Sequence, residues 1–218
     1  MVFVTTPLTL FAQAPQTSHA FWMHSYNQVH FGETHHWAFD GGIRFEQDLP
    51  QPAQRIVRTA YGYQWGKFRL GVGIAWSGTQ VPGSSLLNEI RPHQELIYES
   101  KHGVWRFAAR YRSENRWRQS VSDAYVFQWR NRLMLLTGRD LTPQWQRPIS
   151  ITIANEFFVR SSTTETLALD QNRTIVGLEW QYKPAFQFAI QYNHQIASQN
   201  RLDVLWLVMR SQLFASKR

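Results

Sequence analysis

Apolar and polar residues alternate with a period of two along most of the chain. The stretch VWRFAARYRSENRWRQ, residues 104–119, shows this most clearly, because five arginines and a glutamate occupy one set of alternate positions. The other set carries Trp105, Phe107, Tyr111 and Trp117. Only an extended strand places each set on its own face, since a helix would scatter both sets around its axis. The stretch is therefore predicted to be a β-strand with one charged and one aromatic face.

The same two-faced alternation predicts eleven strands along the chain. They cover approximately residues 20–31, 36–46, 57–65, 68–77, 95–99, 104–119, 127–135, 149–156, 174–182, 186–193 and 201–214. The alternation is weakest in the first of these segments. The polar segments 78–92 and 161–169, which interrupt the pattern, are predicted to be loops.

The composition decides which kind of all-β protein these strands build. Aromatic residues make up 15% of the chain and charged residues only 17%, whereas about 25% charged is typical of a soluble domain. A soluble sandwich or lipocalin-like barrel would bury its apolar face, and its core would be too small for so many rings. A membrane barrel instead turns that face to lipid, with Trp and Tyr in girdles near the strand ends. We therefore expect an antiparallel transmembrane β-barrel with a polar lumen rich in Arg and Glu.

The number of strands follows from the need to close the barrel. A closed sheet leaves no unpaired edge in lipid, where each unsatisfied peptide group is costly. Bacterial single-chain barrels usually have an even number of strands. The expected range is thus about 10–12, with twelve favoured and ten as the alternative. The twelfth strand is expected near the N-terminus or within residues 78–92.

The beginning of the chain predicts export. Residues 1–14, MVFVTTPLTLFAQA, contain an apolar stretch followed by Ala12 and Ala14 in an A-x-A pattern, which is typical of a secretory signal peptide. The positively charged start of such a signal is missing, so we expect a truncated signal, and Pro15 disfavours cleavage directly after Ala14. No linker divides the remainder, and residues 15–218 are expected to form a single β-barrel domain. The absence of cysteine suits a chain that crosses an oxidising compartment.

Four short motifs make the chain similar to a known family. They are RYRSENRW at 110–117, WRNRLML at 129–135, NEFF at 155–158 and, most specifically, DQNRTIVGLEW at 170–180, which is followed by a final hairpin. With these motifs the chain resembles the outer-membrane β-barrels of Gram-negative bacteria catalogued as domain of unknown function 2490. The resemblance covers nearly the whole chain after the signal. It implies a fold and a location in the cell outer membrane, and it brings no activity, ligand or catalytic residue.

Charged residues on the polar face form the strongest candidate site. The lumen-lining candidates are Arg44, Arg58, Arg69, Glu95, Glu99, Arg106, Arg110, Arg112, Glu114, Arg130, Arg132, Glu156, Arg173 and Glu179, and Glu46 and Arg116 share their face. In the first interpretation these side chains cross-link neighbouring strands through charge-assisted hydrogen bonds. In the alternative they line a path for an anionic solute, because arginines outnumber carboxylates in the set.

Other kinds of site find less support in the sequence. Consecutive strand residues face opposite sides, so His35 and His36 cannot easily share a metal ion, and His24 cannot activate Ser25 as a nucleophile. A histidine elsewhere, such as His93, could still act with a distant serine. No cofactor or metal is expected. A nucleic-acid partner is not expected either, because the arginines alternate with aromatic residues and form no single basic surface.

The expected partners are therefore the lipid bilayer of the outer membrane and, as the fold implies, the barrel-assembly machinery. The expected role is that of a structural or binding barrel with a largely filled lumen, with specificity in the loops at 78–90 and 161–170. Two alternatives stay open. One is a narrow anion-selective pore or small-solute channel, and the other is a membrane-embedded lipid-modifying hydrolase.

Overall fold

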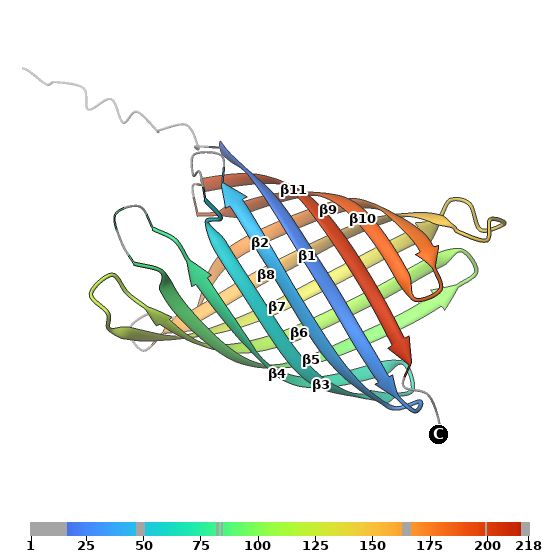
Figure 1. Ribbon diagram of the computed structural model, residues 1–218, viewed down its shortest axis with the longest axis horizontal. Helices are drawn as coiled ribbons and strands as arrows, with labels where there is room; N and C mark the ends of the chain where they lie inside the picture. Colours follow the sequence, from blue (N-terminus) through green and yellow to red (C-terminus); the bar gives the residue numbers. More distant parts are fainter. Residues whose placement is uncertain are drawn as a thin grey trace, which may run out of the picture.

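Eleven β-strands form one closed barrel in the computed structural model of the chain (Figure 1), which describes residues 17–46, 51–81, 83, 85–162, 167–198 and 200–214. The strands are β1 (Thr17–Phe31), β2 (His35–Glu46), β3 (Gln54–Trp65), β4 (Phe68–Thr79), β5 (Leu87–His102), β6 (Trp105–Gln119), β7 (Tyr125–Asp140), β8 (Ile149–Ser162), β9 (Ala168–Lys183), β10 (Phe186–Ala197) and β11 (Asn200–Phe214). Within the described residues there is no helix long and apolar enough to span a membrane. The predicted signal peptide, residues 1–14, lies outside the described residues.

The barrel closes through one parallel pair of strands. Each strand pairs in antiparallel fashion with the next one along the chain, whereas β1 pairs in parallel with β11, from Thr17 opposite Arg201 to His30 opposite Phe214. An odd number of strands in a meander leaves the first and the last running in the same direction, so closure requires such a pair. The all-β closed barrel is confirmed, and its eleven described strands lie within the expected range of 10–12. The favoured number of twelve is corrected to eleven, because the parallel pair removes the need for an even number.

The segment that was expected to be a loop before β5 is part of that strand. β5 begins at Leu87, so residues 87–94, which precede the predicted start of the strand at 95, extend the sheet. The sequence does not indicate a strand here because of Pro92, since proline has no backbone N–H to donate to a neighbouring strand and is rare inside sheets. The pairing of β5 with β6 passes from Ile90–Trp117 to His93–Glu114 without a change of register. Residues 87–92, where a twelfth strand was sought, therefore belong to β5.

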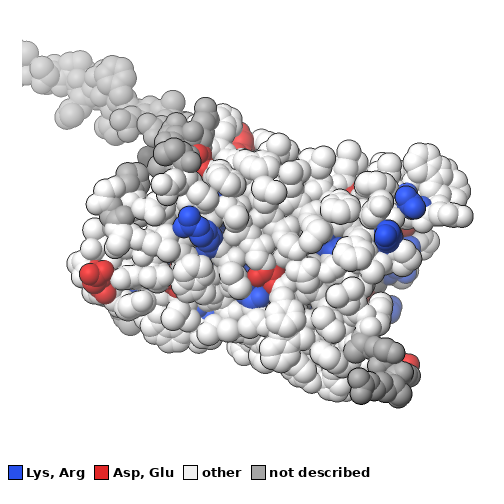
Figure 2. All heavy atoms as spheres, viewed as in Figure 1, with Lys and Arg blue, Asp and Glu red and all other residues white. Residues whose placement is uncertain are grey.

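The two faces of the wall differ in polarity. On β9, Val176, Leu178 and Trp180 point outward and are 40–53% exposed, while Ile175 and Glu179 point inward and are at most 8% exposed. The same alternation continues around the barrel, and Figure 2 shows few charged side chains on the face in view. An apolar outer wall surrounds a largely polar interior, as the period of two predicts.

The two ends of the barrel have connections of different length. At one end, which we call the short-turn end, four connections have two or three residues, 32–34, 66–67, 103–104 and 184–185, and the fifth, 141–148, has eight. At the opposite, long-loop end they are residues 47–53, 80–86, 120–124, 163–167 and 198–199. β1 starts at the long-loop end and β11 finishes at the short-turn end (Figure 1).

The polarity of the wall is testable with one pair of substitutions on β9. Leu178→Arg places a charge on the outer face, where lipid contact costs about 2–4 kcal/mol near the midplane. Gln181→Arg adds the same side chain at a position of β9 that faces inward, and we expect this substitution to be tolerated. The fraction of protein that migrates as a heat-modifiable, folded band measures the outcome. Equal assembly defects in the two variants would mean that the faces are assigned the wrong way round.

Candidate functional site: the charged interior of the barrel

The sequence-predicted lumen residues point to the inside of the barrel. All of the fourteen candidates except Glu99 are buried or half-buried. The Glu99 side chain is 55% exposed and lies 3.6 Å from Arg69 near the short-turn end. Glu46, the last residue of β2, is also exposed, and Arg116 is buried. The alternation thus places these charges on one face and brings most of them into the interior.

Glu156 is the centre of the interior network. Its side chain, on β8, is only 2% exposed and accepts hydrogen bonds from arginines on three different strands. Arg110 on β6 and Arg132 on β7 each approach within 2.8 Å, and Arg173 on β9 within 3.3 Å. One buried carboxylate therefore joins four strands through charge-assisted hydrogen bonds.

Arg132 extends the network from Glu156 to a second carboxylate. Its Nη1 donates to Glu114 on β6 at 2.9 Å, while its Nε and Nη2 donate to Glu156. Glu114 also accepts two hydrogen bonds from Arg130, at 2.5 and 2.7 Å. Arg132 and Arg130 are each at most 10% exposed, so these ion pairs are screened from bulk water.

A related cluster lies toward the long-loop end. Glu89 on β5 accepts hydrogen bonds from Arg91 at 2.7 Å and from Arg116 on β6 at 2.5 Å. Arg116 also donates to Gln128 on β7. All of these side chains are buried. The arginine and carboxylate pairing therefore continues along the barrel axis.

A third cluster, toward the short-turn end, reaches across the interior. Glu179 on β9 accepts hydrogen bonds from Arg106 on β6 at 3.0 Å and from Arg210 on β11 at 3.1 Å. β7 and β8 lie between β6 and β9 in the sheet, so the Arg106 side chain bridges two intervening strands. Its reach shows that interior side chains cross part of the bore.

The remaining predicted charges pair between neighbouring strands. Arg112 on β6 donates two hydrogen bonds to one oxygen of Glu95 on β5, at 2.7 and 3.0 Å. Arg58 on β3 pairs with Asp40 on β2. These contacts have the cross-strand geometry that the structural interpretation predicts.

Arg44 differs from the other interior arginines. Its guanidinium donates to the Gln54 side chain at 2.7 Å and lies 4.0 Å from the centre of the Trp22 ring. No carboxylate of the described residues pairs with it. A cation held by an aromatic face and an amide is stabilised less than one held by a carboxylate. Arg44 therefore carries the least compensated charge of the predicted set.

Aromatic rings fill the space between the charged groups. The Phe158 ring is 1% exposed, and the guanidinium carbons of Arg130, Arg132 and Arg173 lie 4.7–5.5 Å from its centre. Arg173 also lies 5.3 Å from the Trp22 ring of β1. Cations at such distances are attracted to the ring face. These rings therefore fill interior space and also stabilise the arginine charges.

An apolar cluster occupies the side of the interior that is closed by the parallel strands. Its buried members are Trp22, Ala154, Ile175, Ala189, Val204, Trp206 and Val208. The Trp206 indole donates to Nδ1 of His24 at 3.0 Å, which satisfies the buried polar atom of the ring. The bore is thus packed by charged pairs on one side and by apolar side chains on the other.

Several of these interior residues were missed by the sequence patterns. Glu89 and Arg91 fell in the segment that was expected to be a loop. Trp22 and Trp206 lie in strands with apolar residues on both faces, where no alternation marks the inward side. Phe158 could have been predicted to face the interior, because it lies two residues after Glu156 on β8 and therefore on the same face of the strand.

The histidines and serines are arranged as consecutive strand positions require. His24 points inward and is 5% exposed, whereas Ser25 lies on the other face, next to Asn27. His36 is buried and His35 is exposed. The part of the chain that the structure describes holds no group of three or more His, Cys, Asp or Glu residues placed to bind a metal ion.

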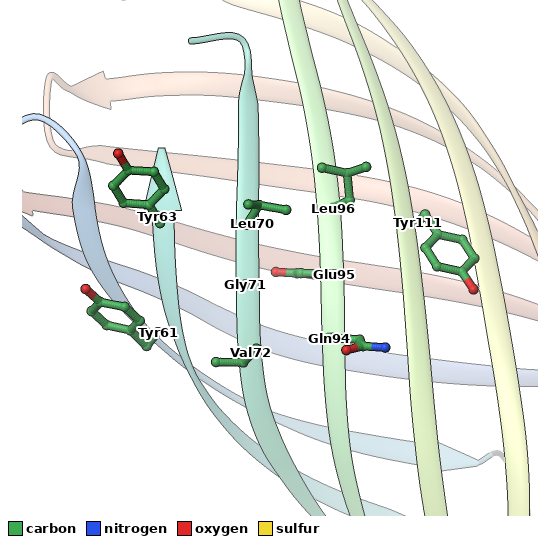
Figure 3. Close-up of a pocket in the computed structure, with 9 residues that line it drawn as sticks. All are labelled: Tyr61, Tyr63, Leu70, Gly71, Val72, Gln94, Glu95, Leu96 and Tyr111. Atoms are coloured by element: carbon green, nitrogen blue, oxygen red, sulfur yellow. The ribbon is translucent and has the colours of Figure 1, made fainter. Parts of the chain in front are cut away.

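A hollow of about 410 Å³ lies on the outer wall (Figure 3). Tyr61 and Tyr63 on β3 border it on one side and Tyr111 on β6 borders the other side. Leu70 and Leu96 lie between them. Smaller side chains between tyrosine ridges account for the hollow, and its apolar lining is continuous with the rest of the wall.

Solved structures with a similar fold are three forms of OmpT, an outer membrane protein of Vibrio cholerae. The outer-membrane expressed form has a TM-score of 0.42 and 10% identity, over 74% of this chain and 53% of that one. The in-vitro folded form has 0.43 and 10%, over 76% and 51%. A loop L8 deletion mutant has 0.44 and 11%, over 78% and 56%. The chain therefore spans about half the length of these structures.

Sequence comparison gives a more direct result. A search of curated proteins finds no match to the chain. A family model, in contrast, matches residues 19–204, which include nearly all of β1–β10 and the beginning of β11. The match confirms the resemblance that the four motifs indicate. The chain accordingly belongs to the family described as protein of unknown function, DUF2490.

Proposed function

We propose that the protein is an integral outer-membrane β-barrel whose lumen is filled by its own side chains. It serves a structural or binding role at its ends and does not conduct solutes. The observation that carries the proposal is the burial of Glu156 and Phe158, which are 1% exposed although both project into the middle of a barrel. Side chains so inaccessible to solvent leave no wide aqueous path beside them.

The outer wall supports residence in a bilayer. Exposed residues such as Val57, Val72 and Ile190, each at least 58% exposed, would be unfavourable in water. They are favourable against hydrocarbon. A closed ring of strands also leaves no backbone edge to be satisfied in lipid. Bilayer-spanning barrels of this kind are characteristic of bacterial outer membranes.

The size of the barrel supports a filled lumen. Barrels of about eight strands are just wide enough for side chains to fill, whereas barrels of sixteen to eighteen strands leave an aqueous channel. With eleven strands, long arginines such as Arg106, which reaches from β6 to β9, span much of the bore. The apolar cluster around Trp206 occupies the remaining side.

One observation favours a narrow anion path as a second candidate. Three arginines share Glu156, and Arg44 has no carboxylate partner among the described residues. The interior is therefore rich in positive charge, which attracts anions. Conductance distinguishes this candidate from the filled barrel.

Membrane residence is tested by fractionation of cells that express the full chain. We expect the protein in the outer-membrane fraction, resistant to alkaline carbonate and released only by detergent. A cold-loaded gel should show a heat-modifiable band, because a closed barrel resists unfolding by detergent alone. Release as a soluble monomer without detergent would contradict the proposal.

The filled lumen is tested by Arg132→Ala. Removing Arg132 takes its hydrogen bonds from the buried carboxylates of Glu114 and Glu156. Glu114 keeps Arg130, and Glu156 keeps Arg110 and Arg173, so the unfolding free energy should fall by about 1.5–3 kcal/mol. We expect a lower thermal midpoint and no steady current in planar bilayers for either the wild-type protein or the variant.

Arg118→Ala is the matched control, since Arg118 is 53% exposed and 3.9 Å from Glu89. Loss of an exposed pair of this kind should cost about 0–1 kcal/mol. A steady, anion-selective current through the wild-type protein that falls in Arg132→Ala would favour the pore instead.

A further inference from the structure

We infer that the outer rim of the short-turn end carries a binding site for the headgroups of anionic phospholipids. The site, which we call the basic rim, consists of Arg139, Arg147 and Lys183. The inference rests on the proposed membrane residence and adds a specific lipid class to it. Neither the predicted lumen residues nor the interior network contributes to this site.

Each cation of the basic rim packs on an aromatic ring of the outer wall. The Arg139 guanidinium, on β7, lies 5.3 Å from the centre of the Trp105 ring on β6. Arg147, in the connection between β7 and β8, lies 5.3 Å from the Tyr182 ring on β9, and the Lys183 ammonium lies 5.5 Å from the same ring. The rings hold the charged groups at the surface of the barrel, where all three residues are exposed.

The register of the sheet keeps the three cations on one side of the barrel. Arg139 is opposite Ile151 of β8, and Ile149 of β8 is opposite Trp180 of β9. Tyr182 follows two residues later on β9. The basic rim therefore spans the short-turn end from β6 to β9, around the connection at 141–148.

The basic rim lacks compensation by carboxylates. None of its three cations forms an ion pair with a described residue. The nearby Asp140 is occupied, because it accepts from Lys101 at 3.2 Å and from Ser150 at 2.8 Å. In Figure 2, Lys and Arg side chains gather at the end on the right. Figure 1 shows that this is the short-turn end of the barrel. The rim therefore presents unpaired positive charge to its surroundings.

The position of the basic rim fits the headgroup region of a bilayer. Trp105, Trp145 and Trp180 are exposed near the same end, and exposed Trp residues mark the interface between lipid and water. Cations just beyond such a girdle lie at the depth of lipid phosphates and are attracted to anionic headgroups. At the long-loop end, carboxylates accompany the exposed cations: Arg118 lies 3.9 Å from Glu89, and Asp203 pairs with His194.

The short connections indicate which leaflet is concerned. In bacterial barrels the short turns face the periplasm and the longer loops face outward. The basic rim would then lie in the periplasmic leaflet, whose lipids are phospholipids. The positive charge of the basic rim and its depth in the bilayer both favour an anionic phospholipid such as phosphatidylglycerol as the ligand.

The experiment compares the wild-type protein with the triple variant Arg139→Gln, Arg147→Gln, Lys183→Gln. Both are folded as full chains into vesicles of equal parts phosphatidylcholine and phosphatidylglycerol, extracted in mild detergent, and analysed for retained lipid by mass spectrometry. We expect phosphatidylglycerol to be enriched in the wild-type sample and the enrichment to fall at least about fivefold in the variant. High salt should reduce it as well, because the attraction is electrostatic.

The control variant Arg55→Gln, Arg118→Gln, Arg201→Gln removes the same charge from exposed residues at the long-loop end. It should retain the enrichment, and an equal loss there would overturn the inference in favour of a general charge effect. Wild-type protein that gives a heat-modifiable band but retains both lipids equally would overturn the inference while membrane residence stands. Protein that never inserts would overturn both.

Discussion

The parallel pairing of β1 with β11 is the constraint on which the rest of the barrel depends. Without it, both strands would present a row of unpaired N–H and C=O groups, from Thr17 to His30 on one side and from Arg201 to Phe214 on the other. Each such group costs several kcal/mol in hydrocarbon. A sheet with eleven strands can satisfy them only by pairing two strands that run in the same direction.

Closure also divides the side chains between two surroundings. Every residue of the wall faces either outward or into a bore that eleven strands keep narrow. Charged side chains in that bore are stable only when they are paired, because a buried unpaired charge is strongly destabilising. The arrangement of Arg110, Arg132 and Arg173 around Glu156 follows from this requirement. The rings of Phe158 and Trp22 pack against these arginines inside the bore.

The sequence predicts which face of a strand a side chain lies on better than it predicts which side chains meet inside the barrel. Where apolar and charged residues alternate strictly, as on β6 and β9, the inward residues follow from parity. Which arginine meets Glu156 depends on the register and the number of strands, and no local pattern encodes either. β11 has apolar residues on both faces, such as Leu205 outside and Trp206 inside, so its inward side was not evident. Pro92 leaves a gap in the pairing of β5 with β6, and a proline inside the segment concealed the strand that carries Glu89 and Arg91. The family resemblance supplied the fold and no binding residues.

The most direct test of the account is a disulfide across the closing pair. Met23 is opposite Leu207 on the outer face, and the natural chain contains no cysteine. The double variant Met23→Cys, Leu207→Cys should form an intramolecular disulfide under mild oxidation, while Met23→Cys, Leu213→Cys, displaced by six residues, should not. An additional strand between β1 and β11 would separate the first pair by about 9–10 Å between Cα atoms, beyond the limit of about 7 Å for a disulfide. Failure of Met23→Cys, Leu207→Cys to cross-link in folded protein would contradict closure by eleven strands.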